Sequence, residues 1–207
     1  MVEFLSITLL ILLAAISPGP DFFLVVKNSL QHSRKAGIFT AIGVSFSLLI
    51  HSIYCILGLA LIISHSLLLF TCIKYLGASY LIYLGIKSVL AKPEERFEIG
   101  ADSGRVNSAF KSFIQGLLCN LLNPKAIMFI LAFFTLIIKP TMSWAVQLGY
   151  CVEIALIHFI WFSGLSLLIN HQKIRASLNR IEYYVVKAMG FVLIGFGARI
   201  ATLSHLV

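Results

Sequence analysis

Charge is scarce in this chain, and acidic charge is the scarcest. Only 12% of its 207 residues are charged, with 8 Asp and Glu against 16 Lys and Arg. Hydrophobic residues make up 59%, so a soluble protein of this size would lack the polar surface to cover them. A lipid bilayer removes that requirement. The composition therefore indicates an integral membrane protein and excludes an ordinary soluble domain.

Features that mark several other classes of protein are also missing. The net charge of +8 does not indicate nucleic-acid binding, because the basic residues lie between apolar runs, as the positive-inside rule expects. The first apolar run has no basic segment before it and exceeds a signal-peptide core, so an uncleaved first span is expected. No cysteine belongs to a C-x-x-C pair, so we expect neither disulfides nor a metal site, and no cofactor. The cysteines are Cys55, Cys72, Cys119 and Cys151.

Six apolar runs divide the chain, each near the roughly 20 residues that cross a bilayer. They predict an all-α integral membrane protein of about six transmembrane helices, with residues 1–207 forming a single domain. The runs are Phe4–Val26, Ala36–Ser64, Leu67–Leu90, Phe110–Ile138, Trp144–Ile169 and Tyr184–Leu203. The first, third and fifth connections, with the adjoining helix ends, hold 12 of the 16 Lys and Arg. These connections are therefore predicted to be cytoplasmic, with both termini outside.

Three short motifs recur in the second half of the chain, in the same order and at similar offsets. Ser17-Pro18 matches Asn123-Pro124, Leu49-Ile50-His51 matches Leu156-Ile157-His158, and Lys74-x-x-Gly77 matches Lys187-x-x-Gly190. They predict a 3+3 duplication, with repeat 1 over about 1–92, a cytoplasmic connection over about 91–110 and repeat 2 over about 108–207. An odd number of spans per repeat inverts the second copy, as in secondary transporters with a site between the repeats.

The first span contains the sequence Ser17-Pro18-Gly19-Pro20-Asp21. Each proline removes a backbone donor and clashes with the preceding turn, so the helix is expected to break here. Broken helix at membrane depth is tolerated only inside protein or beside a wet cavity. Asp21 would begin the second half-helix, where amide donors and the positive dipole end favour a carboxylate. The alternative is a structural kink in which Asp21 is only a helix cap.

The fourth span contains a second break, at Pro124. Asn120 and Asn123 precede it on one helix face. Lys125 must snorkel, pair or lose its proton in the membrane. Asp21 is its expected partner, because the repeat brings both breaks near one axis; a lysine snorkelling to the interface is the alternative.

The fifth span contains one acidic residue, Glu153, about one turn before His158. The carboxylate and the imidazole are expected to face one cavity and to bind or relay protons. Helix packing is the simpler interpretation of His158 and of its counterpart His51.

Taken together, these motifs resemble the LysE-type family of bacterial inner-membrane amino-acid exporters, over essentially the whole chain. The resemblance lies in S-P-G-P-D, in N-x-x-N-P-K-A, in Gly37–Gly43 and in the run Tyr75–Gly85. It implies proton-driven efflux of amino acids or their derivatives, with no enzymatic activity. It also implies a site formed by Ser17, Pro18, Gly19, Pro20, Asp21, Asn123, Pro124 and Lys125. Ser47 and Thr135-Leu136-Ile137 depart from the family pattern and leave the solute undecided.

A zwitterion suits this site, with Lys125 for its carboxylate and Asp21 for its ammonium group. The expected partners are an amino acid, protons and the lipid bilayer, without nucleic acid, and a homo-oligomer stays open. One alternative is a divalent metal-ion exporter, which calls for more intramembrane carboxylates than Asp21 and Glu153. Another is a thiol-relay oxidoreductase, which calls for a cysteine near each break, whereas only Cys119 lies near one.

Overall fold

The computed structural model describes residues 2–17, 19–90, 108–137, 142–169, 187–188, 190–199 and 201–202. Nearly all of these residues are helical and none of them is in a strand, which confirms the all-α prediction. The described helices are α1 (Val2–Ile16), α2 (Pro20–Gln31), α3 (Arg34–His65), α4 (Leu67–Leu90), α5 (Ala109–Leu121), α6 (Pro124–Ile137) and α7 (Trp144–Leu168). A shorter apolar helix, Gly190–Arg199, follows.

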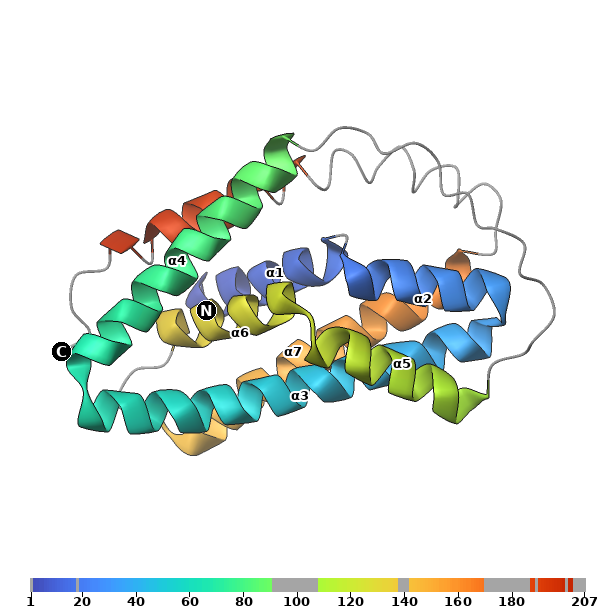
Figure 1. Cartoon of the computed structure of the whole chain (residues 1–207), viewed down its shortest axis with the longest axis horizontal. Helices are drawn as coiled ribbons and strands as arrows, with labels where there is room; N and C mark the ends of the chain where they lie inside the picture. The colour runs from blue at the N-terminus through green and yellow to red at the C-terminus, as the bar shows by residue number, and fades with distance from the viewer. Residues whose placement is uncertain are drawn as a thin grey trace.

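The helices pass back and forth along the long axis of the molecule (Figure 1). α1 and α2 together make one pass, α3 returns, α5 and α6 together run in the direction of α3, and α7 runs back against them. α4 diverges from this bundle, and the red segment that contains Gly190–Arg199 runs beside it. The alternation matches the order of the predicted spans, whereas the side that faces the cytoplasm stays a prediction.

Four of the predicted spans are recognisable by length and apolar composition. Within the described residues, Arg34–Gly58 and Trp144–Leu168 are unbroken helices long enough to cross a bilayer. The pairs α1–α2 and α5–α6 also qualify if each is one broken span, bent by 57° and 61°. α4 occupies the third predicted span, and Gly190–Arg199 lies within the sixth. The basic residues predicted for the third and fifth connections, at 92–105 and 173–180, lie outside the described residues.

Proline starts the second half of each broken span, as the sequence predicted. Pro20 is at the first turn of α2 and Pro124 is the first residue of α6. That position tolerates proline because its amide would have no helical partner. The helix starts pair Pro20 with Pro124, whereas the sequence comparison paired Pro18 with Pro124. The two breaks are thus equivalent as helix starts, while the 3+3 duplication itself stays a prediction.

Glycines allow α3 and α5 to pack backbone against backbone. A Cβ atom at Gly43 would lie 2.1 Å from the carbonyl oxygen of Phe113, and one at Gly116 would lie 2.1 Å from that of Thr40. Gly85 packs closely in the same way, because a Cβ there would lie 2.6 Å from the carbonyl oxygen of Gly190. Small residues permit such close contacts between helices in a membrane.

The buried side-chain amide of Asn28 joins three helices in the same part of the bundle by hydrogen bonds. The Asn28 Nδ2 group on α2 donates to Thr40 Oγ1 on α3, at 2.8 Å, and to Gln115 Oε1 on α5, at 3.0 Å. Asn28 and Thr40 are almost fully buried. Hydrogen bonds of this kind join helices where the membrane offers no other partner, so α2, α3 and α5 are fixed relative to one another.

Candidate functional site

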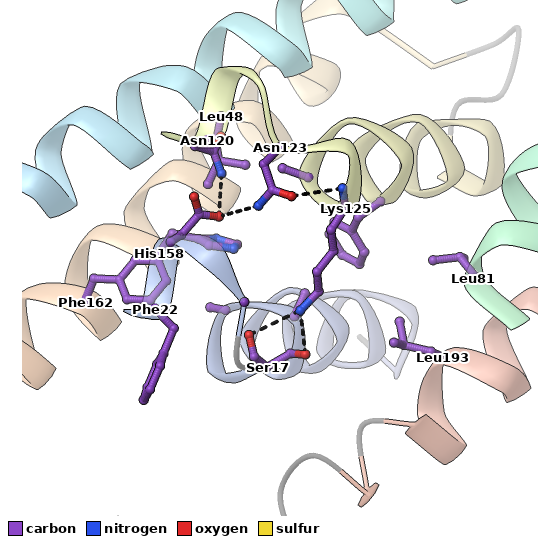
Figure 2. Close-up of a pocket in the computed structure, with 16 residues that line it drawn as sticks. Ser17, Phe22, Leu48, Leu81, Asn120, Asn123, Lys125, His158, Phe162 and Leu193 are labelled. Atoms are coloured by element: carbon purple, nitrogen blue, oxygen red, sulfur yellow. Dashed lines mark hydrogen bonds between the residues drawn. The ribbon is translucent and has the colours of Figure 1, made fainter. Parts of the chain in front are cut away.

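The two helix breaks meet at a cavity of about 50 Å³ (Figure 2). One water molecule needs about 10–15 Å³ measured this way, so the cavity has room for a few waters. Its lining includes six polar residues from both breaks and from α7. They are Ser17, Asp21, Asn120, Asn123, Lys125 and His158.

Asp21 enters the cavity wall from the first turn of α2. Its Oδ2 atom accepts hydrogen bonds from Asn120 Nδ2 at 2.9 Å and from Asn123 Nδ2 at 3.0 Å (Figure 2). The two asparagines thus meet the aspartate across the breaks, a contact that the sequence did not predict. Its Oδ1 atom is buried and accepts no N–H or O–H from the described residues.

Lys125 enters the same cavity from the first turn of α6. Its ammonium nitrogen donates to the hydroxyl of Ser17 at 2.8 Å and to the Ser17 carbonyl at 3.3 Å. Figure 2 shows the side chain extended toward Ser17, which places it inside the protein and not at a lipid interface. Electrostatic attraction also links it to Asp21, the partner expected from the sequence.

Gly19 lies against the lysine side chain. A Cβ atom at Gly19 would lie 3.4 Å from Lys125 Nζ, which is ordinary contact distance. The backbone there is extended and would accept any residue, with φ −170° and ψ −175°. Glycine at this position therefore widens the cavity beside the ammonium group.

Asn123 connects the two charged residues through one amide group. Its Oδ1 atom accepts a hydrogen bond from the backbone amide of Lys125 at 3.0 Å, which caps α6. Its Nδ2 group donates to Asp21. Because both ends of the amide are engaged, the side chain has one orientation and holds the start of α6 against the start of α2.

The two intramembrane histidines differ in position. His158 lines the cavity, and its Nδ1–H donates to the Ile154 carbonyl at 2.8 Å. The other ring nitrogen, Nε2, then has no proton and is an acceptor. His51 lies outside the lining; its Nε2–H donates to the Asn120 carbonyl at 3.2 Å, and its Nδ1 bonds to the Tyr54 hydroxyl. His51 therefore fixes the end of α5 that carries Asn120.

Glu153 is not brought to the cavity with His158. It is absent from the lining and accepts a hydrogen bond from the Thr8 hydroxyl of α1 at 2.6 Å. Of the other predicted site residues, Pro20 and Pro124 shape the breaks without lining the cavity. Pro18 lies outside the described residues.

The apolar part of the lining was missed by the sequence interpretation. It includes Phe22, Leu48, Leu81, Phe129, Phe162 and Leu193. Leu81 and Leu193 come from α4 and from Gly190–Arg199, the two helices that diverge from the bundle. Such residues carry no signal in a chain whose spans are apolar throughout.

This arrangement has the chemistry to contact both ends of a small dipolar solute, because acidic and basic side chains face one partly open cavity with apolar walls. A model of the LysE type translocator family matches residues 12–204. The chain belongs to this family. The resemblance seen in the sequence motifs is therefore confirmed, and the cavity is that of a LysE type translocator.

Relatives span nearly the same length as this translocator. It is 35% identical over 191 residues to the uncharacterized membrane protein YrhP of Bacillus subtilis, covering 89% of this chain and 91% of the relative. It is also 30% identical to the threonine efflux protein of Salmonella typhimurium over 199 residues, which cover 95% of this chain and 96% of the relative. The threonine efflux protein of Escherichia coli K12 is 30% identical over 202 residues, which cover 94% of this chain and 95% of the relative. No solved structure matches the chain.

Proposed function

We propose that this LysE type translocator is a secondary transporter that exports amino acids across the bacterial inner membrane in exchange for protons. The observation that supports the proposal best is the pair of opposite charges, Asp21 and Lys125, around one cavity. An α-amino acid has a carboxylate and an ammonium group on adjacent atoms of one small molecule. Lys125 would bind the carboxylate and Asp21 the ammonium group.

The lining favours amino acids with an uncharged side chain. Among the described residues that line the cavity, Asp21 and Lys125 are the charged ones apart from the titratable His158. A lysine or arginine substrate would bring a second positive charge without a second carboxylate to pair it, and an unpaired buried charge is costly. The relatives named threonine efflux proteins agree with a substrate of this class.

The wider architecture belongs to the same proposal. One domain of two inverted repeats would place both breaks near the middle of the membrane, where secondary transporters bind their substrates. Two bent spans that both restart at a proline support this symmetry. The basic connections would face the cytoplasm and both termini the outside.

Efflux from cells that lack their own exporters tests the proposal. Cells are loaded with threonine, leucine or lysine, and in parallel are challenged with manganese or cadmium. We expect faster efflux of threonine or leucine than from cells without the protein, and no gain for lysine. Asp21→Asn and Lys125→Gln should each lower this efflux at least about tenfold at equal membrane abundance, since each leaves a partner charge unpaired.

Two results would contradict the proposal. Wild-type efflux by both variants would show that the charge pair does not bind the substrate. Rescue from manganese or cadmium without any amino-acid efflux would favour the metal-ion exporter instead.

A further inference from the structure

The hydrogen bonds on Asp21 are distributed unequally between its two oxygen atoms. Oδ2 accepts from both Asn120 and Asn123, while the buried Oδ1 accepts from no N–H or O–H of the described residues. An ionised carboxylate spreads its charge over both oxygens and accepts at each. A neutral carboxyl group has one carbonyl oxygen that accepts and one hydroxyl that donates. A buried Oδ1 without such a donor is more costly on an ionised carboxylate than on a neutral carboxyl group, so the site favours a proton on Asp21 when no substrate is bound.

We propose that Asp21 is the residue that binds the transported proton, and that the proton and the substrate ammonium group occupy this carboxyl group in turn. The inference rests on the proposed function, because it assumes that the cavity binds an amino acid. It goes further by naming one side chain as the point where the two fluxes are coupled.

The other titratable groups around Asp21 have contacts of their own, and Lys125 and His51 also interact with Asp21 electrostatically. The Lys125 ammonium on α6 donates to Ser17 of α1, and both ring nitrogens of His51 on α3 are hydrogen-bonded. His158 on α7 faces the cavity with its Nε2 atom, since its Nδ1–H bonds to a backbone carbonyl. On α5, the Cys119 thiol is a weak hydrogen-bond donor to the carboxyl group. None of these groups is a second carboxylate, and α4 and Gly190–Arg199 add only leucines to the lining.

The exchange follows from the need to neutralise a buried carboxylate. With the amino acid bound, its ammonium N–H groups can donate to Oδ1, and Asp21 is ionised. When the amino acid leaves on the outer side, Oδ1 would remain a buried charged acceptor without an N–H or O–H donor among the described residues, which is costly. Binding a proton from outside removes that cost. On the inner side the next ammonium group displaces this proton into the cytoplasm.

The charge balance gives the stoichiometry. A zwitterion on ionised Asp21 and charged Lys125 makes the loaded site neutral. A proton on Asp21 leaves the returning site with one positive charge, that of Lys125. Each cycle therefore moves one amino acid out, one proton in and one net positive charge in. Both the pH gradient and the membrane potential would drive export.

Infrared difference spectroscopy on the purified full-length protein tests the assignment. The probe is L-threonine, or the best-exported amino acid of the efflux panel if that is another. Adding it to the wild-type protein should remove the C=O stretching band of a protonated carboxyl group. In weakly buffered solution it should also release up to one proton per protein molecule. The band should be missing from Asp21→Asn before any addition, and present and substrate-sensitive in the control Glu153→Gln.

The outcomes separate this inference from the proposed function. If the wild-type protein moves no amino acid in proteoliposomes, the proposed function itself fails. If it exports an amino acid but the substrate-sensitive band persists in a folded Asp21→Asn variant, another residue binds the proton and the inference is wrong. It is also wrong if the wild-type band does not respond to the exported amino acid. A band lost on Glu153→Gln would assign the proton to Glu153 instead.

Discussion

Asp21 and Lys125 occupy the same place in two different helices, the residue directly after the proline that starts α2 and α6. The amide groups of a helix start attract negative charge and disfavour positive charge. Asp21 is therefore at a favourable position and Lys125 at an unfavourable one. The contacts with Ser17 and the cap by Asn123 offset part of that cost, so these two polar residues help to hold the lysine in place.

The first prediction concerns Asn123, which both caps α6 and donates to Asp21. Asn123→Ala removes both contacts, whereas Asn123→Ser keeps a capping oxygen and loses only the contact with Asp21. Loss of a cap costs about 0.5–2 kcal/mol, so the alanine variant should unfold at a lower temperature than the serine variant in detergent. Both should export more slowly than wild type. Equal melting temperatures for the two variants would contradict the capping role.

The second prediction concerns the contact between α3 and α5. Gly43→Ala and Gly116→Ala each place a methyl group about 2.1 Å from a backbone oxygen, and overpacking costs about 1–3 kcal/mol or more. Both variants should lower the melting temperature and the yield of folded protein on size-exclusion chromatography. Gly58→Ala on the same helix α3 is the matched control, because nothing lies within 4 Å of its added methyl group. Comparable losses for all three would show that the close contact is not the cause.

The third prediction concerns the buried amide of Asn28. Asn28→Ala removes its bonds to Thr40 and Gln115, and Thr40→Val removes one of them while keeping the shape of the side chain. A double-mutant cycle on the free energy of unfolding should give a coupling of about 0.6 kcal/mol, the average for hydrogen bonds between membrane helices, and at most about 1.7 kcal/mol. Additive effects of the two changes would mean that the bond contributes nothing to stability.

The fourth prediction concerns Glu153, which lies outside the cavity. Glu153→Gln keeps an acceptor for the Thr8 hydroxyl, so the contact between α1 and α7 should survive. Initial efflux rates should stay within about twofold of wild type. A tenfold loss would need the removal of an interaction worth about 1.4 kcal/mol, and this substitution removes none that contacts the cavity. A loss of export comparable to that of Asp21→Asn would instead show that Glu153 takes part in transport.

The breaks and the charged site residues could be predicted from the sequence because they stand out in an apolar background. Proline within a span is incompatible with an unbroken helix, and Asp21, Lys125 and the asparagines need partners at membrane depth. The orientation of Glu153 follows from helix geometry, since a step of five positions to His158 turns the two side chains about 140° apart. The expectation that both face one cavity overlooked that angle.

The partners of those residues could not be predicted in the same way. Ser17 as an acceptor for Lys125, and two asparagines on one oxygen of Asp21, depend on how the half-helices cross. Leu81 and Leu193 cannot be told from the many other apolar residues of the sequence, because only tertiary packing places them at the cavity. The sequence comparison paired Pro18 with Pro124, but two prolines stand in the first motif and only the folded chain shows that Pro20 begins a helix.

The distance along the chain between Asp21 and Asn120, 99 residues, has a consequence for synthesis. Ribosomes add about 5–20 residues per second. The first span therefore waits on the order of 5–20 seconds, with its carboxyl group in or near the bilayer, before the asparagines that bind it exist. During that interval the cost of placing the Asp21 carboxyl group in the membrane must be lowered by the insertion machinery, by water at the membrane surface or by protonation. If Asp21 is not accommodated during this interval, the expected failure is misinsertion of the amino-terminal half of the chain, before any transport begins.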